Sequence, residues 1–366
     1  MRKTDMKGSG NSDMEIKPLI IGDLEAKIPV LQGGMGVGIS LSNLAGNVAL
    51  CGGIGVISAA QIGYRRPEWD TDPIGANLKA IGEEIRRAKE IAKGGIVGIN
   101  IMVATKYYEK YVKAAVEAGA DMIISGAGLP VDLPELAGNT GVKLAPIVSS
   151  LKSLNVIAKY WLKKFQRVPD MVVIEGPLAG GHLGFQKEQL MDIPAMNYDE
   201  EVKKIIARTR EIAEEQGTYI PVVAAGGIYD RKDMEHCLAM GADGVQVATR
   251  FVTTYECDAD SRYKEAYLLA GRDDIEIVNS PVGMPGRAIH NRFQDEVKAG
   301  KVPHGKCHQC IKTCRPDETP YCITDALIAA AKGDIENGLL FCGANAYRAD
   351  KMEHVADIMK EFGNDD

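Results

Sequence analysis

The chain has 366 residues, of which 45% are hydrophobic and 25% are charged, and its formal net charge at pH 7 is -7. These values are typical of a globular protein with a large core, and an acidic chain of this kind is not expected to bind nucleic acid. No apolar run approaches the ~20 residues that span a bilayer, so we expect a cytoplasmic protein without a membrane partner. Residues 1–17 are polar and rich in Gly and Ser, which predicts a disordered leader rather than a signal peptide.

Short apolar runs recur along residues 18–254, and most of them end in a glycine-rich or polar loop. Charged or amphipathic stretches between them predict helices at 77–93, 107–118, 199–216 and 231–240, the last capped by Asp230. Eight short strands that alternate with helices match a (β/α)8 TIM barrel better than an open doubly wound sheet. The expected strands are 28–31, 53–58, 96–102, 121–125, 143–148, 171–174, 221–224 and 244–248.

The alternation of strands and helices stops after Phe251. Residues 255–343 mix helical pieces with a cluster of cysteines, which predicts a smaller and mostly helical lid. An amphipathic stretch at 344–362 predicts a C-terminal helix that packs back on the barrel. We therefore expect the barrel domain, residues 18–254, to be completed by residues 344–366.

The most distinctive stretch is Glu175–Phe185, which reads EGPLAGGHLGF and follows the sixth expected strand. Active sites of TIM barrels lie at the C-terminal ends of the strands, so this loop belongs to the functional face. The glycines around His182 allow the backbone and a ligand to approach each other closely. His182 is thus a candidate base, the alternative being a buried histidine that is satisfied by backbone groups.

The loops after the seventh and eighth strands form a candidate phosphate site. Many TIM barrels hold a phosphate there with backbone N–H groups and a helix N-terminus. The segment 225–227 (AGG) supplies unhindered amides, and the segment 248–250 (ATR) adds amides, a hydroxyl and the guanidinium of Arg250. The alternative is a pair of tight turns that need glycine for a positive φ.

The first loop, residues 32–38 (QGGMGVG), has almost no side chains and suits the face of a planar ring. Its glycine spacing is not that of a Rossmann fingerprint. Asn100, at the end of the third strand, could hydrogen-bond a flavin carbonyl or ring nitrogen, or could instead cap a turn.

Taken together, these motifs resemble those of the nitronate monooxygenase family, formerly called 2-nitropropane dioxygenases, whose close relatives are the flavin-dependent enoyl-acyl-carrier-protein reductases. The likeness implies a barrel that binds FMN, with its phosphate at the seventh and eighth loops and its ring across the barrel mouth. His182 matches the family histidine regarded as the catalytic base or substrate-orienting group. The motifs are residues 32–36, 98–102, 175–184, 224–228, 245–251 and 287–289. The implied cofactor-binding residues are Gly33, Gly34, Met35, Asn100, Glu175, Gly180, Gly181, Ala225, Gly226, Gly227, Gln246, Ala248 and Thr249.

The resemblance predicts the oxidation of small nitroalkanes or alkyl nitronates by O2 to a carbonyl compound and nitrite. The alternative keeps the fold and FMN but is an NAD(P)H-dependent enoyl-acyl-carrier-protein reductase. Its acidic carrier-protein partner would need a basic rim, for which Arg287, Arg292 and Lys298 are candidates, although such charges are more often a solvated face. A non-catalytic flavin- or metal-binding regulatory protein is a third option, which the retained histidine and glycines disfavour. The sequence is also compatible with a homodimer.

Four cysteines, Cys307, Cys310, Cys314 and Cys322, crowd into sixteen residues beside His304. Four thiols this close could ligate Zn²⁺ or an iron–sulfur cluster, and a cluster near FMN could pass electrons from a redox partner. Their spacing matches neither the ferredoxin run nor the zinc ribbon. The alternative is a set of reduced thiols that pack a small lid.

Overall fold

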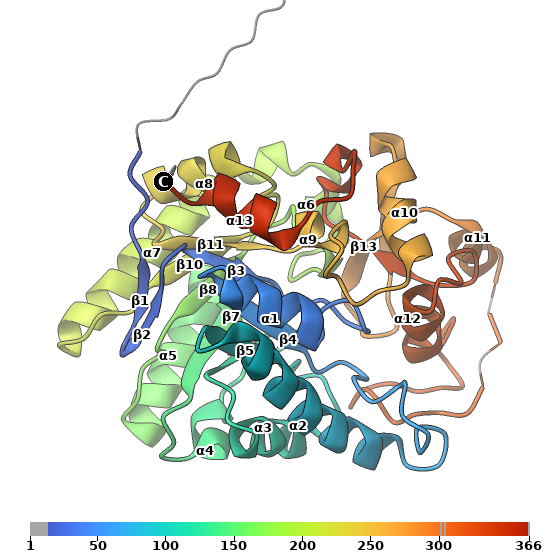
Figure 1. Cartoon of the computed structure of the whole chain (residues 1–366), viewed down its shortest axis with the longest axis horizontal. Helices are drawn as coiled ribbons and strands as arrows, with labels where there is room; N and C mark the ends of the chain where they lie inside the picture. The colour runs from blue at the N-terminus through green and yellow to red at the C-terminus, as the bar shows by residue number, and fades with distance from the viewer. Residues whose placement is uncertain (1–13, 301, 304, 365–366) are drawn as a thin grey trace, which may run out of the picture.

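The core of the protein is a closed barrel of eight parallel strands, seen in a computed structural model that describes residues 14–300, 302–303 and 305–364. The last strand pairs with the first and closes the ring (Figure 1). The predicted (β/α)8 barrel is therefore confirmed. Its strands are β3 (Val30–Gln32), β4 (Ile54–Ser58), β5 (Ile96–Asn100), β6 (Met122–Ser125), β7 (Lys143–Val148), β8 (Val172–Glu175), β10 (Val222–Ala225) and β11 (Gly244–Val247).

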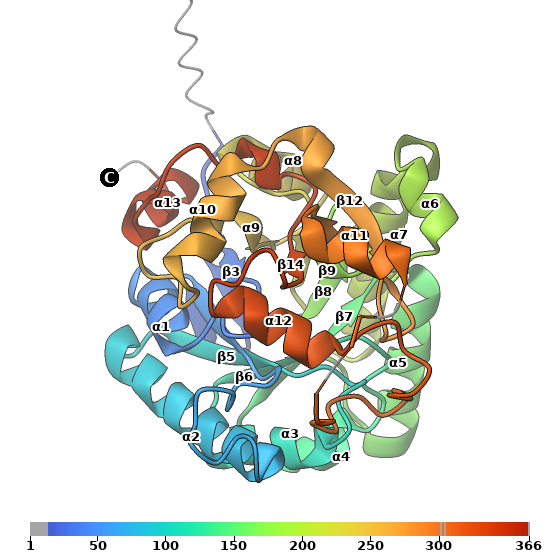
Figure 2. The same cartoon turned by 90° about the vertical axis from the view of Figure 1, so that its right-hand side faces the viewer.

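Helices surround the barrel. Helix α2 starts four residues before its predicted range, because Asp72 caps it and Pro73 fills its first position. Asp230 caps α8 as predicted, by accepting a hydrogen bond from the N–H of Asp233. We did not predict α1, α4 or α5, which complete the ring in Figure 2. The outer helices are α1 (Ser42–Leu50), α2 (Pro73–Ala92), α3 (Tyr108–Glu117), α4 (Leu133–Ala137), α5 (Leu151–Phe165), α7 (Tyr198–Glu215), α8 (Arg231–Ala239) and the single turn α9 (Thr249–Val252).

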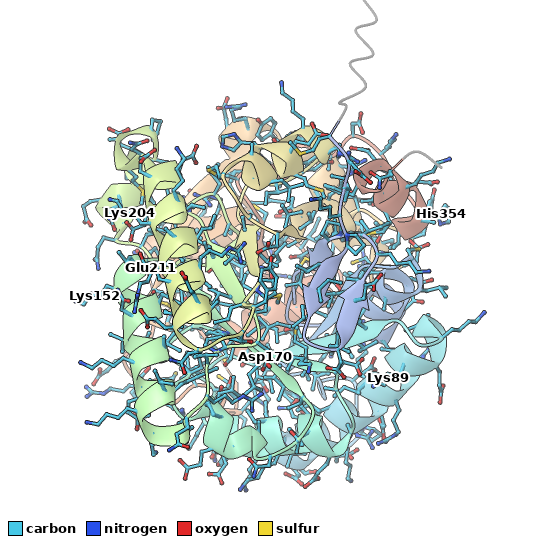
Figure 3. The ribbon with its side chains drawn as sticks, turned by 90° about the vertical axis from the view of Figure 1, so that its left-hand side faces the viewer. Lys89, Lys152, Asp170, Lys204, Glu211 and His354 are labelled. Carbon is cyan, nitrogen blue, oxygen red and sulfur yellow. The ribbon has the colours of Figure 1, made fainter. Side chains whose placement is uncertain are left out.

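The N-terminal end of the barrel is closed by a hairpin of β1 (Leu19–Ile21) and β2 (Leu24–Ala26), whose apolar residues join the core inside the barrel. Three aspartates that stand just before β6, β8 and β11 also secure this end, which faces the viewer in Figure 3. Asp121, Asp170 and Asp243 each accept a hydrogen bond from a backbone N–H of the preceding barrel strand, at 2.9, 2.8 and 2.6 Å. This closed end leaves the opposite end of the barrel for function.

The two ends of the described chain meet on the barrel. Ile16, near the end of the expected leader, is 4% exposed, and its N–H donates to the side chain of Asn364 at 2.9 Å, whereas its neighbours Met14, Glu15 and Lys17 are exposed. Residues 1–13 of that leader lie outside the described residues. Helix α13 (Val355–Phe362) packs on α1 and α8, but the predicted helix at 344–362 was too long. Its first part contains only the short 3-10 turn Ala346–Arg348, and the stretch around Glu353 is extended, because backbone hydrogen bonds join Glu353 to Thr253 and Tyr255.

The lid covers the C-terminal ends of the strands (Figure 2). It contains the expected helices, α10 (Ser261–Leu269), α11 (Arg292–Ala299) and α12 (Ile323–Ala331). It also contains an antiparallel sheet that we did not predict, because its Pro- and Gly-containing turn resembles a loop. This sheet joins β12 (Ile275–Asn279), β13 (Pro285–Ile289) and β14 (Leu340–Phe341) to β9 (Gly181–His182), which comes from the barrel loop after β8. The same long loop carries the short helix α6 (Lys187–Met191). Across the described chain, no helix is long and apolar enough to cross a membrane.

Candidate active site

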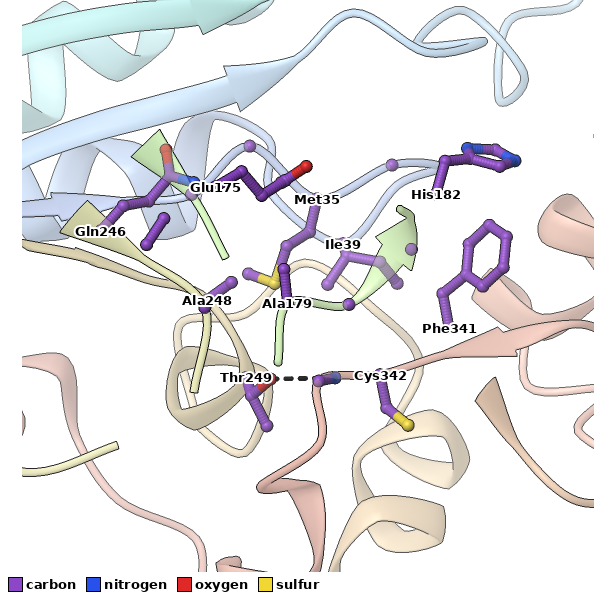
Figure 4. A pocket seen from close by; sticks show the side chains of 18 of the residues that line it. Met35, Ile39, Glu175, Ala179, His182, Gln246, Ala248, Thr249, Phe341 and Cys342 are labelled. Atoms are coloured by element: carbon purple, nitrogen blue, oxygen red, sulfur yellow. Dashed lines mark hydrogen bonds between the residues drawn. The ribbon is translucent and has the colours of Figure 1, made fainter. Parts of the chain in front are cut away.

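A cavity lies between the barrel mouth and the lid (Figure 4). His182 and all thirteen predicted cofactor-binding residues line it, and the full lining includes residues at or next to the ends of all eight barrel strands. The lid adds Tyr263, Tyr267 and Phe341, which we did not single out. Nothing in the local sequence marks these aromatic residues, since only the folded lid brings them to the site.

His182 lies on β9, which pairs with β13 of the lid through the register His182 to Gly286. Its Nε2 atom lies 2.7 Å from Oγ of Ser280, and its ring packs edge-on against Phe341 with 5.0 Å between ring centroids. Burial lowers the pKa of His182 to about 4, so the ring is neutral at pH 7. The polar partner of this ring is therefore a serine side chain. The alternative that we considered was a histidine satisfied by backbone groups, and the structure shows a side-chain partner instead.

Glu175, the last residue of β8, points into the same cavity (Figure 4). No described residue donates a hydrogen bond to its carboxylate, and burial raises its pKa to about 7. Its carboxyl group is thus divided between the neutral and charged forms at physiological pH. Such a group is an available hydrogen-bonding partner for a ligand.

The loop after β10 forms a cradle without side chains. Gly226 and Gly227 have φ angles of +100° and +84°, and an added Cβ would lie 2.9 Å from the carbonyl oxygen of Gly176 or 2.8 Å from the side chain of Leu178. The backbone amides of both glycines find no acceptor among the described residues. Thr249 stands at the neighbouring strand end, and its hydroxyl accepts a hydrogen bond from the N–H of Gly343 at 3.1 Å (Figure 4). Unpaired amides beside a hydroxyl are suited to an oxyanion such as phosphate.

Arg250 takes no part in this cradle, so our expectation of a guanidinium at the phosphate was wrong. Its side chain is directed into the packing beneath the C-terminal segment, where it pairs with Glu353 at 3.0 Å and Glu361 at 2.6 Å. It also donates to the carbonyl oxygen of Tyr229 at 3.2 Å. The residue is 7% exposed, and its role in the structure is to anchor the C-terminus.

The first loop lies flat against the cavity wall. A Cβ on Gly34 would meet Cβ of Asn100 at 2.5 Å, and one on Gly33 would meet Gln246 at 3.3 Å. The backbone therefore packs directly on these two amide side chains. Neither amide hydrogen-bonds another described residue, and Asn100 does not cap a turn. Both side chains are free to bond the heteroatoms of a planar ring.

Comparison with known proteins decides the family. A family model described as nitronate monooxygenase matches residues 17–365. The chain belongs to the nitronate monooxygenase family. It is thus a member of a family of flavin-dependent oxidoreductases, as the motifs predicted.

Individual relatives are distant. A probable nitronate monooxygenase of Staphylococcus saprophyticus is 26% identical over 302 residues, which cover 76% of this chain and 80% of the relative. A (3aS,4S,5R,7aS)-5-hydroxy-7a-methyl-1-oxo-octahydro-1H-indene-4-carboxyl-CoA dehydrogenase of Mycobacterium tuberculosis is 24% identical over 277 residues, 76% of this chain and 67% of the relative.

Two solved structures share the fold. FabK from Thermotoga maritima has a TM-score of 0.69 and 24% identity over 92% of both chains. A nitroalkane oxidase from Streptomyces ansochromogenes has a TM-score of 0.67 and 19% identity over 92% of this chain and 94% of that one.

Of the three basic residues suggested for a carrier-protein rim, one is buried and two are exposed beside acidic residues. Arg287 is buried at 4% exposure and donates to the carbonyl oxygen of Ala179, and burial lowers the pKa of its guanidinium. Arg292 and Lys298 are exposed, but each has an acidic partner. Glu296 lies 3.5 Å from Arg292 and Glu276 lies 2.8 Å from Lys298.

The cysteine cluster is not arranged as a metal site. Among the described residues, no three His, Cys, Asp or Glu side chains come together in a group that could hold a metal ion. Cys307 is exposed, while Cys310 and Cys314 pack against the apolar core of the lid. His304 lies outside the described residues. Among the residues that the structure describes, the zinc or iron–sulfur site that we considered is not formed, and the packing of Cys310 and Cys314 agrees with the alternative of reduced thiols that pack the lid.

Proposed function

We propose that this protein uses FMN to oxidise alkyl nitronates with O2, releasing a carbonyl compound and nitrite, and that it takes nitroalkanes after removal of their α-proton. The proposal is carried by one arrangement. A neutral histidine, His182, faces a cavity that is also lined by the glycine cradle after β10 and by the glycine-rich first loop.

The residues of the cavity fit FMN. The free amides of Gly226 and Gly227 and the hydroxyl of Thr249 would hold the phosphate. The flat loop that begins at Gly33 leaves room for the ring, while the unpaired amides of Asn100 and Gln246 would bond its heteroatoms. Bound FMN would supply the electron acceptor for the substrate carbanion and would pass the electrons to O2.

His182 would take the α-proton of a nitroalkane. In our assignment the Nε2–H of the ring donates to Oγ of Ser280, which leaves Nδ1 with the free lone pair. Proton transfer creates an imidazolium beside the new nitronate, and the negative charge of the nitronate offsets the low pKa that burial gives the ring. A nitronate that arrives deprotonated needs binding alone, so it is the substrate that this site favours.

The second candidate, an enoyl-acyl-carrier-protein reductase, draws support from the likeness of the fold to FabK. It requires reduced nicotinamide, whereas nitronate oxidation does not. The pairing of Arg292 and Lys298 with acidic residues, together with the burial of Arg287, counts against a basic surface for a carrier protein. We therefore place this function second.

The absorption spectrum of the purified protein tests the proposal. We expect a flavin spectrum that bleaches when a nitronate is added under argon and does not bleach with NADH. Readmission of air should restore the colour and release nitrite. Rapid bleaching by NADH, with turnover of a crotonyl thioester, would establish the reductase instead. A protein that takes up no FMN would refute both functions.

A further inference from the structure

A second and smaller cavity adjoins the active site between the lid and the barrel mouth. It has a volume of about 30 Å³ open to the centre of a water-sized sphere. Four residues line both cavities, namely Ala60, Met102, His182 and Leu327. His182, to which we assign proton transfer, therefore borders a space in which one small group of a bound substrate can lie.

The barrel side of this cavity presents hydrogen-bond donors that have no acceptor. The N–H of Gly63 donates to Oδ1 of Asn77 at 2.8 Å, which fixes the orientation of that amide. Nδ2 of Asn77 then donates to Oε1 of Gln61 at 3.0 Å and to the hydroxyl oxygen of Tyr111 at 2.6 Å. Nε2 of Gln61 and the O–H of Tyr111 are left as donors, and no described residue accepts from either.

Thr105 adds a third hydrogen-bonding group to the same wall. Its hydroxyl has no partner among the described residues, and Gln61, Thr105 and Tyr111 are all more than nine-tenths buried. The other polar pair in the lining, Thr324 and Cys310, hydrogen-bond each other. Buried donors without acceptors are costly, so three around one cavity indicate a ligand. Because about 30 Å³ holds two or three heavy atoms, that ligand is a small group with acceptor oxygens.

The donors are held in place before a ligand arrives. Gln61 has a φ of +46°, a left-handed conformation that a residue with a side chain rarely adopts and that recurs at functional sites. Thr105 is fixed by a β-bridge to Ile311 of the lid, and its N–H donates to the carbonyl oxygen of Met102 at 3.0 Å. Preorganised donors of this kind stabilise negative charge that develops during a reaction.

We propose that this cavity binds the nitro group of the substrate. Its nitrogen and two oxygens match the space, and the oxygens would accept hydrogen bonds from Gln61, Thr105 and Tyr111. When the α C–H bond breaks, the proton passes to Nδ1 of His182 and the electron pair forms the C=N bond of the nitronate. The negative charge then lies on the nitro oxygens, where the three donors stabilise it. This inference rests on the proposed function and deepens it by naming the residues that hold the reacting group.

Replacing Thr105 by Val removes one donor with little change of shape. The oxygens of a nitronate carry their charge before binding, so for nitronates we expect KM to rise about tenfold, with kcat within about twofold of wild type. In a nitroalkane the charge develops only as the proton leaves, so kcat should fall about tenfold, with KM within about twofold. Thr105→Ser keeps the hydroxyl and should restore both values to within about threefold. Loss of kcat alone on both substrates, or no loss on either, would overturn the inference.

The binding of nitrite, which has the three atoms of a nitro group, tests the site without turnover. Calorimetry on the purified protein with FMN present should give a dissociation constant about tenfold higher for Thr105→Val than for wild type. Thr209→Val is the matched control, because it removes a buried hydroxyl that bonds Ile205 at 2.8 Å and does not line the cavity. Equal nitrite affinities in wild type and Thr105→Val, or equal losses in the two Val variants, would mean that the donors hold water and would overturn the inference. Nitrite binding that Thr105→Val weakens, in a protein that oxidises no nitronate, would refute the proposed function and leave the site established.

Discussion

Nε2 of His182 lies 2.7 Å from Oγ of Ser280, a residue 98 positions further along the chain. His182 belongs to a barrel loop, whereas Ser280 directly follows β12 of the lid. The pairing of β9 with β13 holds the two segments together. The lid therefore does more than cover the cavity, because it orients the residue to which we assign proton transfer.

Replacing His182 by Asn should separate the two substrate types. We expect kcat/KM for neutral nitroalkanes to fall at least about 100-fold, because the variant has no base for the α-proton. Nitronates should keep most of their rate, since they arrive deprotonated. Nitrite release from matched nitroalkane and nitronate pairs measures both. Equal loss on the two substrates would show that His182 is not the base.

Ser280→Ala should lower turnover of nitroalkanes about tenfold, with a smaller effect on nitronates. The reason is that the ring of His182 loses the acceptor that fixes its tautomer and orientation. Ser280→Thr, which keeps the hydroxyl, should restore most of the rate. Ser149→Ala removes another serine hydroxyl, one that bonds Gly184 at 3.3 Å, and serves as the control. Unchanged rates in Ser280→Ala would contradict the assigned tautomer.

The sequence predicted those features of the fold that depend on residues close together along the chain. Each barrel strand is a short apolar run with a glycine or polar residue at its end, so the strand count, and with it the place of His182 and Gly226, followed directly. The lid sheet was missed because it depends on pairing between segments as distant as His182 and Gly286. Arg250 was misassigned for the same reason, since its partner Glu353 lies more than one hundred positions away.

Gly227→Ala should weaken FMN binding at least about tenfold. A side chain there would contact Leu178 at 2.8 Å and displace the amides that we assign to the phosphate. Gly217 is a matched control, because its φ of +61° imposes similar strain, while an added Cβ would have no neighbour within 4 Å. Gly217→Ala should lose about 1 kcal/mol of stability through its positive φ, and Gly227→Ala should lose more because of its contact with Leu178. Titration of the flavin-free protein with FMN should show weaker binding for Gly227→Ala alone, and equal affinities would remove the cradle from the phosphate site.

Arg250→Met should destabilise the protein and leave the binding of FMN unchanged. It leaves the carboxylate of Glu353, whose side chain is 11% exposed, without its main partner. We expect the free energy of unfolding in urea to fall by about 3 kcal/mol. The dissociation constant of FMN should stay within twofold of wild type, because the guanidinium points away from the cavity. A large loss of FMN affinity in a variant of near-normal stability would return Arg250 to the phosphate site.

Glu175 should make the stability of the flavin-free protein depend on pH. Burial raises the pKa of its carboxyl group from 4.5 to about 7, so between these values the folded state binds more protons than the unfolded state. The free energy of unfolding therefore falls as the pH rises through this range, by about 3 kcal/mol at most. Glu175→Gln has no charge to desolvate. The gain in the free energy of unfolding of this variant over wild type should be absent near pH 4 and complete above pH 8.

Urea unfolding of both proteins across this range measures that difference, and the subtraction removes the titration of all other groups. A difference that does not change with pH would mean that the carboxylate is solvated or paired in the folded protein. Glu175 would then no longer be the free hydrogen-bonding partner that we assign to the cavity.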